Sequence, residues 1–264
     1  ILQKINDLTN EYNENNDYYK ISTIQYLGTR ENQEDTVSYI TQKENVFACL
    51  ADGIGGLEFG EIASGLSVLT LLKHFITYSS INNQFLVSAM QDADRRVMQF
   101  IEDNHLSGSG CTTIGIFINK NDLFFSSVGD SSVFLFRNNQ LQLLNRHHNY
   151  KLYLDEMLQK ERISIKDYRV NLNKKDVVIS YIGKGELRLL DFNKQGFKLK
   201  EGDILLICSD GLLSALSNEL IIEVIKKNKN PTTITTSLMN LVRMKRREKQ
   251  DNTSIITILK ERGI

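Results

Sequence analysis

Residues 46–64 read VFACLADGIGGLEFGEIAS and carry the clearest pattern in the chain. An apolar run over residues 46–51, typical of a buried strand, stops at Asp52. A charge at the tip of a buried strand is costly unless a cation lies nearby. The glycines at positions 53, 55 and 56 allow the backbone to approach such a cation or its ligand closely. The stretch therefore predicts a strand that delivers one carboxylate to a binding site.

Two helices are predicted to follow, over about 61–78 and 83–104, because apolar residues recur there at helical spacing. In the first helix these residues are Ile62, Leu66, Leu69 and Ile76. In the second they are Leu86, Ala89, Met90, Ala93, Val97 and Ile101. Two more helices are predicted later in the chain, over about 213–227 and 232–246.

Strand-like runs occupy much of the remaining sequence. They cover residues 20–27, 36–40, 111–119, 123–128, 132–137, 140–144, 203–208 and 254–259. These strands arrive in groups with helix pairs between the groups, rather than alternating singly with helices. This order favours an α+β fold in which two antiparallel sheets pack together and the helices lie outside them.

The chain is predicted to form a single domain over residues 19–264, after an Asn-rich N-terminal extension at residues 1–18. A looser segment, about 146–197, mixes charged residues with short helical pieces and is predicted to be a lobe added to the sheet. The single proline, Pro231, leaves no proline-rich linker that would mark a second domain.

The composition excludes several classes of partner. Lys and Arg together number 32, as do Asp and Glu, so net charge gives no general attraction to nucleic acid or to an anionic membrane. No apolar run is long enough to span a bilayer, and no secretion-type leader is visible. The three scattered cysteines, Cys49, Cys111 and Cys208, are typical of buried thiols in a reducing compartment. We therefore expect a cytoplasmic protein. We also expect it to be a monomer.

Five aspartates lie at the ends of predicted strands. They are Asp35, Asp52, Asp130, Asp210 and Asp251. Carboxylates at the strand ends of one sandwich can meet at one rim, where they repel each other unless a cation is present. A set of oxygen ligands suits Mg²⁺ or Mn²⁺ rather than Zn²⁺. The sequence therefore predicts a divalent metal centre.

The predicted centre suits phosphate chemistry. Asp52 has two oxygens and could bridge two ions, and such a pair lowers the pKa of a bridging water and clamps a phosphoryl oxygen. Arg30 is the natural partner for the phosphate, because a guanidinium can donate two parallel hydrogen bonds.

Other interpretations are weaker. A single Asp-Gly after a strand is most often only a turn. A thiolate phosphatase needs an arginine six positions after its cysteine, and none of the three cysteines has one. The pair Asp92 and Asp94 resembles an aspartyl nucleophile motif, but it falls inside a helical pattern and is predicted to be a solvated face. The GIGG turn at 53–56 lacks the further residues of a nucleotide-binding loop.

Six short motifs occur in the order found in one family. They are RENQED (30–35), ADGIGG (51–56) with GEIAS (60–64), CTT (111–113), GDS (129–131), SDGL (209–212) and DN (251–252). Over roughly residues 20–260 the chain resembles the metal-dependent protein phosphatases of type 2C, the PPM family, in its bacterial form. The resemblance implies a four-layer αββα sandwich with two Mn²⁺ or Mg²⁺ ions. It also implies hydrolysis of phosphoserine and phosphothreonine, placed on proteins by a Ser/Thr kinase, by a metal-activated water without a covalent intermediate.

The resemblance also implies a role for each matching residue. Asp52 would bridge both ions, and the Gly53 carbonyl would bind one of them. Asp210 and Asp251 would complete the shell of the other ion. Arg30 would bind the phosphate of the substrate.

The resemblance also implies roles for acids at the edge of the site. Asp35 and Glu34 would hold metal-bound waters. Asp130, together with Asp210, would serve a third and weaker metal. The segment 146–197 matches the family's flap lobe, which varies in sequence and touches substrate.

Three positions depart from the family pattern. Ile54 stands where some eukaryotic members carry His, and an apolar residue there is usual in bacterial members. Leu57 replaces a common His, and Ser132 replaces the frequent Arg of the GDSR motif. The Ser132 departure keeps an alternative open, namely a weak or inactive phosphatase-fold module that binds phosphoproteins.

Two other features are predicted to have no catalytic role. His147 and His148 are expected to be surface or structural residues. The basic run at 243–249 is expected to be an exposed helix face rather than a nucleic-acid site.

Overall fold

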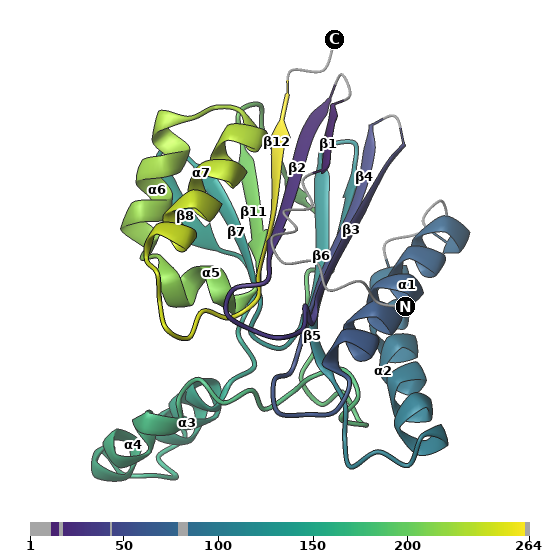
Figure 1. Ribbon diagram of the computed structural model, residues 1–264, viewed down its shortest axis with the longest axis vertical. Coiled ribbons are helices and arrows are strands. Elements are labelled where there is room, and N and C mark those ends of the chain that lie inside the picture. The colour runs from purple at the N-terminus through teal and green to yellow at the C-terminus, as the bar shows by residue number, and fades with distance from the viewer. Residues whose placement is uncertain (1–11, 16–17, 43, 79–83, 262–264) are drawn as a thin grey trace.

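Two antiparallel sheets pack face to face in the computed structural model, which describes residues 12–15, 18–42, 44–78 and 84–261 (Figure 1). The first sheet has the order β1 (Tyr12–Asn15), β2 (Tyr19–Tyr26), β12 (Thr253–Lys260), β11 (Ile204–Cys208), β7 (Ser132–Arg137) and β8 (Gln140–Leu143). The second has the order β10 (Phe197–Lys198), β6 (Asp122–Val128), β5 (Cys111–Asn119), β4 (Asn45–Gly53) and β3 (Asp35–Gln42), and β9 (Asp191–Phe192) also pairs with β6.

Helices cover the outer face of each sheet. On the second sheet they are α1 (Gly60–Tyr78) and α2 (Phe85–Asp103); on the first they are α5 (Asp210–Ala215), α6 (Asn218–Lys227) and α7 (Pro231–Met244). One apolar cluster fills the space between the sheets, and one lies between each sheet and its helices. These three cores make the four layers of an αββα sandwich and confirm the predicted fold class.

Strand pairing brings the predicted acids to one end of the sandwich. In the second sheet, β3 and β4 pair so that Asp35 lies opposite Asp52. In the first sheet, β11 runs antiparallel to β12, so Asp210 just after β11 and Asp251 just before β12 lie at the same edge. The loops that follow β2 and precede β12 lie side by side at the lower end in Figure 1.

A lobe projects from the same lower end of the body (Figure 1). It consists of α3 (Tyr150–Gln159), α4 (Ile165–Asn171) and a short 3₁₀ helix (Leu172–Lys174), which pack against one another. The last part of the predicted lobe segment, 146–197, does not belong to the projection, because β9 and β10 add to the second sheet. The projecting lobe is therefore shorter than the sequence suggested.

The exposed face of α1 differs from what its periodicity suggests. Ile62, Leu69 and Ile76 do share one stripe, but they are 37%, 64% and 68% exposed. The face that packs on the sheet instead carries smaller side chains beside larger ones, such as Ala63 and Phe75. In α2 the predicted apolar positions are buried or partly buried, as expected.

Several element boundaries also differ from the predictions. The strand β1 pairs with β2, so part of the predicted extension belongs to the sheet. The helix predicted over 213–227 is two helices, α5 and α6, separated at residues 216–217 where the backbone is extended. The helix α7 ends at Met244, so residues 245–249 of the basic run lie beyond it and the predicted exposed helix face is wrong for them.

Candidate functional site

Asp35 is the most deeply buried acid of the site. Its side chain is 4% exposed, and it accepts a 2.9 Å hydrogen bond from Ser209 Oγ through Oδ2. Its other oxygen, Oδ1, has no hydrogen-bond partner among the described residues. Burial raises the pKa of Asp35 to about 7. A buried carboxylate with one unsatisfied oxygen is suited to hold a water or a cation.

Asp52 lies at the centre of the acidic group. Burial raises its pKa well above the usual range, and the charges of four other aspartates raise it further. Those four are Asp35, Asp210, Asp130 and Asp251. Because all four charges act on one carboxyl group, the structure brings the five predicted aspartates into a single electrostatic neighbourhood.

Asp210 and Asp130 approach this neighbourhood from two loops. Asp210 begins α5, and the next residue must be glycine because a Cβ on Gly211 would lie 2.0 Å from the Asn252 carbonyl oxygen. Burial, and then the charge on Asp251, raises the pKa of Asp210 to about 6. Asp130 follows Gly129, and burial, with the charge on Asp210, raises its pKa to about 7.

Arg30 contacts Asp251 directly. Its Nη2 donates to Asp251 Oδ2 at 2.6 Å, and the two side chains are 45% and 38% exposed. This hydrogen bond raises the pKa of Arg30 above its usual range. The guanidinium also lies against Gly55, where an added Cβ would be 3.1 Å from Nη1. The glycine turn after β4 therefore leaves room for the arginine rather than for a side chain of its own.

Glu34 is held beside the same turn. Its carbonyl accepts a hydrogen bond from Gly53 N at 3.1 Å, and its own N–H donates to Asn252 Oδ1 at 2.8 Å. A Cβ on Gly53 would lie 2.8 Å from Glu34 Cβ and from the Gly60 backbone, so only glycine fits. Burial, followed by the charge on Glu61, raises the pKa of Glu34.

The residues present fit a divalent cation. Within the described ranges, no three His, Cys, Asp or Glu side chains are already grouped tightly enough to hold a metal by themselves. The aspartates nevertheless share one neighbourhood, burial and mutual repulsion raise the pKa values of Asp52, Asp130 and Asp210, and one oxygen of Asp35 is unsatisfied. All donors are oxygens, which favours Mg²⁺ or Mn²⁺. A small inward movement of the acidic side chains around such an ion would relieve their repulsion.

Several supporting residues were not identified from the sequence. Asn252 is 3% exposed, and its Nδ2 donates to the carbonyls of Leu27 and Asn32, so it holds the loop that carries Glu34. Its position beside Asp251 in the DN motif was the available signal. Ser209 tethers Asp35, as described above. Their roles depend on contacts between distant segments, which sequence spacing does not reveal.

Two more acids belong to the surroundings of the site. Glu61, in the first turn of α1, acts on Glu34 through its charge. Asp176, just after the 3₁₀ helix of the lobe, acts in the same way on Asp130 and Asp210. The motif around residues 60–64 pointed to Glu61, whereas no sequence pattern marked Asp176.

The two histidines have structural contacts. His148 is fully buried and accepts a hydrogen bond from Gly129 N through Nδ1. His147 Nε2 lies 2.8 Å from Ser132 Oγ, so the serine that departs from the GDSR motif has a polar partner. Burial lowers the pKa of both histidines. They connect the β6–β7 turn to the segment that enters the lobe.

Two predictions about other motifs have different outcomes. All three cysteines are free and buried, and burial raises the pKa of each thiol, which agrees with the exclusion of thiolate chemistry. Asp94, however, is not on a solvated face. It is 7% exposed and its Oδ1 accepts a 2.7 Å hydrogen bond from Gly183 N. The predicted solvated face holds only for Asp92, whose side chain is 22% exposed and pairs with His74, Arg95 and Arg96.

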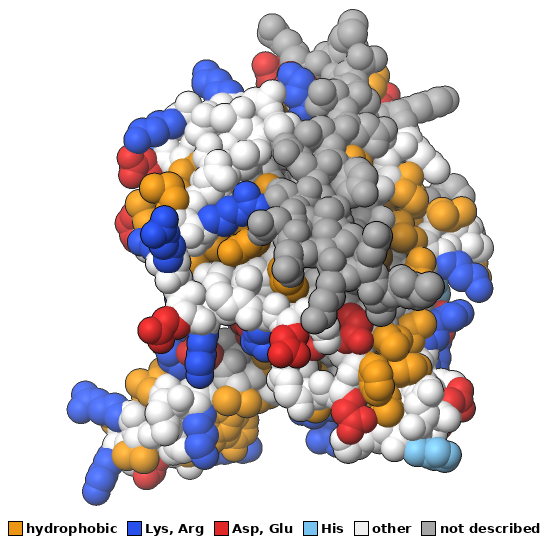
Figure 2. All heavy atoms as spheres, viewed as in Figure 1, with side chains coloured by type: hydrophobic (Ala, Val, Ile, Leu, Met, Phe, Trp, Pro, Cys, Tyr) orange, Lys and Arg blue, Asp and Glu red, His pale blue; other side chains and the backbone are white. Residues whose placement is uncertain are grey.

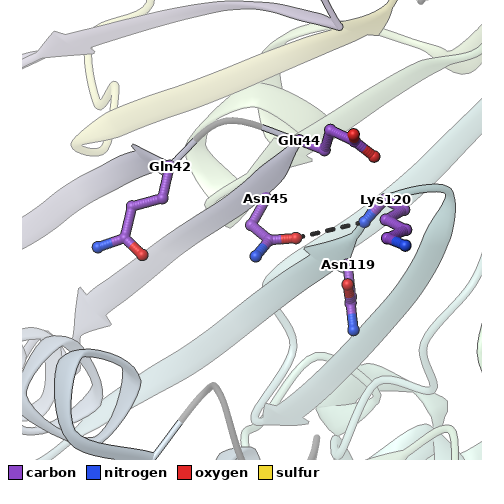
Figure 3. A pocket seen from close by; sticks show the side chains of 5 residues that line it. All are labelled: Gln42, Glu44, Asn45, Asn119 and Lys120. Atoms are coloured by element: carbon purple, nitrogen blue, oxygen red, sulfur yellow. Dashed lines mark hydrogen bonds between the residues drawn. The ribbon is translucent and has the colours of Figure 1, made fainter.

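A pocket of about 480 Å³ lies away from the acids (Figure 3). Its lining residues are Gln42, Glu44, Asn45, Asn119 and Lys120, and Lys120 N donates to Asn45 Oδ1 at 3.4 Å. It is formed where β3 and β5 end and β4 begins, which is the opposite end of the second sheet from Asp52. The acidic rim, rather than this pocket, is therefore the candidate site.

No helix in the described ranges is long and apolar enough to cross a membrane.

Comparison with known proteins identifies the family. The family model described as protein phosphatase 2C matches residues 19–178. The serine/threonine phosphatase stp of Listeria welshimeri is 26% identical over 210 residues, covering 76% of this chain and 80% of that protein.

Solved structures share the fold. The serine/threonine phosphatase of S. agalactiae superposes with a TM-score of 0.77 at 25% identity, covering 92% of this chain and 100% of that one. The catalytic domain of the phosphatase PstP in complex with two manganese ions superposes with a TM-score of 0.72 at 22% identity, covering 93% of this chain and 99% of that one. With the family model matching more than half of its length, the chain belongs to the protein phosphatase 2C family and is of the bacterial type.

Proposed function

We propose that this protein phosphatase hydrolyses phosphoserine and phosphothreonine in proteins at a two-metal centre that binds Mn²⁺ or Mg²⁺. The observation that carries the proposal is the set of five aspartates whose charges converge on Asp52, with Arg30 at their edge. Metal dependence is supported by the family and by the manganese ions in the PstP structure. The serine/threonine specificity is supported by the names of the Listeria and S. agalactiae relatives.

Each acid has a role consistent with its position. Asp52 would contact both ions and the Gly53 carbonyl one of them, because both residues end β4 at the centre of the acidic group. Asp210 and Asp251, from the opposite sheet, would complete the ligand set. When bound, two divalent ions lower the pKa of a water between them and neutralise the phosphoryl oxygens.

The remaining acids would act around the two central ions rather than bind them directly. The unsatisfied Oδ1 of Asp35 and the carboxylate of Glu34 can each accept a hydrogen bond from a metal-bound water. Asp130 lies close enough to Asp210 for their charges to interact, which suits a third and weaker cation between them. Asp35 would stay in place because Ser209 holds its other oxygen.

Arg30 would bind the phosphate of the substrate. Its guanidinium has five N–H donors, so it can keep one hydrogen bond to Asp251 while it donates others to a phosphoryl oxygen. The contact with Asp251 orients the arginine toward the rim before substrate arrives. Its 45% exposure leaves the remaining donors accessible.

The proposal extends to the source of the substrates, the compartment and the oligomeric state. We infer that its substrates are phosphorylated by a Ser/Thr kinase, and that it acts in the cytoplasm, where its three buried free thiols would remain reduced. We also infer that residues 19–264 act as one monomeric domain. Size-exclusion chromatography with light scattering tests the monomer, and a stable dimer at micromolar concentration would contradict it.

The central experiment measures hydrolysis of p-nitrophenyl phosphate and of a phosphothreonine peptide with Mn²⁺, with Mg²⁺ and after chelation. We expect metal-dependent turnover that Asp52→Asn lowers by at least about 100-fold, because it removes one charge from the centre of the ligand set. Asp103→Asn is the matched control, because it removes an exposed carboxylate at the end of α2, where it accepts a hydrogen bond from Gln99.

The same experiment distinguishes an active phosphatase from an inactive module that binds phosphoproteins. Folded wild-type protein that binds the phosphopeptide but shows no turnover with either metal would make the chain an inactive binding module. The departure that motivated this alternative, Ser132, is accommodated in the structure by its contact with His147.

A further inference from the structure

A basic segment, residues 245–249, lies beside the site although the proposed chemistry does not use it. Its sequence is KRREK, and all five residues are exposed. It follows α7, and the preceding Met244 is 74% exposed as well. Four cations against the single Glu248 make the segment strongly positive in a chain whose Lys+Arg and Asp+Glu counts are equal.

Hydrogen bonds fix this segment next to Arg30. Immediately after it, the Gln250 carbonyl accepts from Thr29 N at 2.9 Å, and Gln250 N donates to Thr29 Oγ1 at 3.0 Å. Thr29 precedes Arg30, which is itself paired with Asp251. The C-terminal end of the basic segment, Lys249, is therefore bonded in sequence to Gln250, whose partner Thr29 directly precedes the proposed phosphate-binding arginine.

A second anchor joins the segment to the metal-binding side. Arg247 Nη1 donates to the carbonyl of Ser214 in α5, the helix that begins with Asp210. This contact holds Arg247 against α5. Lys245, Arg246 and Lys249 form no ion pair with any described residue, so their charges face solvent.

In Figure 2, blue and red side chains gather where the body narrows toward the lobe, and Figure 1 places the loop between α7 and β12 in this region. A peptide whose phosphorylated residue reached Arg30 would extend over this rim. Its neighbouring side chains would then come within reach of the basic segment.

We propose that the basic segment is a specificity surface that binds acidic residues flanking the phosphorylated residue of the protein substrate. The inference rests on the proposed phosphatase function and adds a substrate class to it, namely phosphoproteins with Asp or Glu close to the phosphorylated residue. Solvent-exposed lysines and arginines attract such carboxylates over several ångströms, and salt screens this attraction.

The chemistry of the segment favours a peptide over a nucleic acid. It holds no aromatic side chain on which a base could stack, and the acids of the rim would repel a continuous chain of phosphates. An acidic peptide needs only a few carboxylates near the cations, while its single phosphate enters the site where metal and Arg30 neutralise it.

The test compares two phosphothreonine peptides of equal length, one flanked by Asp and Glu and one flanked by Ala. For wild-type protein with Mn²⁺ we expect a kcat/KM that is about fivefold to tenfold higher for the acidic peptide, mainly through a lower KM, since a few exposed ion pairs supply this much. The preference should shrink at high salt. The Lys245→Gln/Lys249→Gln variant should lose most of it while hydrolysis of p-nitrophenyl phosphate, which has no flanking residues, stays within about twofold.

The matched control is Lys226→Gln/Lys229→Gln, which removes the same charge from exposed positions at the end of α6 and just after it. It should keep the wild-type preference. Equal kcat/KM for the two peptides, or an equal loss in the control, would overturn the inference while p-nitrophenyl phosphate turnover still supported the phosphatase. Loss of binding to an RNA oligonucleotide in the Lys245 and Lys249 variant, with unchanged peptide kinetics, would also overturn it in favour of a nucleic-acid site.

Discussion

Arg30 and Asp251, which are 221 positions apart in sequence, share a 2.6 Å hydrogen bond at the mouth of the site. The contact joins the loop after β2 to the loop before β12, and the backbone bonds between Thr29 and Gln250 run beside it. It therefore couples a proposed phosphate ligand to a proposed metal ligand. The position of the Arg30 side chain therefore depends on that of Asp251, and the reverse is also true.

Replacing Arg30 should impair catalysis much more than folding. Arg30→Ala is expected to lower kcat/KM for a phosphopeptide by about 100-fold, because it removes charged donors that face the phosphate. Arg30→Lys should recover only part of this loss, since an ammonium cannot make two parallel hydrogen bonds. Because the ion pair with Asp251 is exposed, the free energy of unfolding should change by only about 1 kcal/mol or less. Steady-state kinetics and urea unfolding measure both, and a large loss of stability would mean that Arg30 mainly supports the fold.

Two glycines of the turn after β4 should differ in their response to alanine. An added Cβ at Gly55 meets only the movable guanidinium of Arg30 at 3.1 Å, so Gly55→Ala should raise KM and leave the thermal midpoint nearly unchanged. At Gly53 the Cβ would be 2.8 Å from Glu34 Cβ and from backbone, so Gly53→Ala should destabilise the protein by about 1–3 kcal/mol.

Gly65 provides the control for both glycine variants. It lies inside α1 with no atom within 4 Å of an added Cβ, so Gly65→Ala should stabilise the protein by about 1 kcal/mol. Thermal unfolding and KM measured on the same samples distinguish the three cases. A Gly53→Ala protein as stable as wild type would show that the turn can shift without cost.

Stability without metal should fall as the pH rises from about 4 to 7. The pKa values of Asp35 and Asp130 are raised to about 7 and that of Asp210 to about 6, so the folded state binds more protons than the unfolded state in this range. The stabilisation is complete below the ordinary aspartate pKa of about 4 and is lost as each group ionises in the folded protein. Chemical unfolding in chelator at pH 5 and pH 7.5 should show the lower stability at pH 7.5.

Two further measurements test whether the buried aspartates cause this pH dependence. Asp35→Asn should reduce the pH dependence and raise metal-free stability at pH 7.5, because it removes one buried charge. Mn²⁺ should raise the thermal midpoint more at pH 7.5 than at pH 5, where protons compete with it. A metal-free protein that becomes more stable between pH 5 and pH 7.5 would contradict the prediction.

Asn252 should be important for both fold and activity. Its side chain accepts from Glu34 N and donates to the carbonyls of Leu27 and Asn32, all within a nearly buried position. Asn252→Ala leaves these groups unpaired and should cost about 2–4 kcal/mol in the free energy of unfolding. Asn252→Asp keeps the acceptor for Glu34 N but sets a carboxylate oxygen against the carbonyls of Leu27 and Asn32, so it should be at least as destabilising as Asn252→Ala. Urea unfolding provides the measurement, and a stable Asn252→Ala protein would show that water replaces the lost bonds.

Local patterns were sufficient to predict most of the fold. Strand and helix periodicity depends on neighbouring residues, so β5 and β7 were predicted with their observed bounds and α1 and α2 to within a few residues. The same patterns placed Asp52 and Asp210 at strand ends, and the order of the motifs indicated the family. Whether each acid binds metal stays a prediction.

The sequence alone therefore determined most of the strands and helices and which acids could meet. Only the tertiary structure decided which side of α1 faces solvent, since periodicity shows that Ile62 and Leu69 share a stripe but not where the sheet lies. It also decided that Asp94 is buried against Gly183 and that Gln250, which follows the basic segment, pairs with Thr29, which precedes Arg30. These outcomes depend on packing between segments far apart in the chain, for which no local pattern carries a signal.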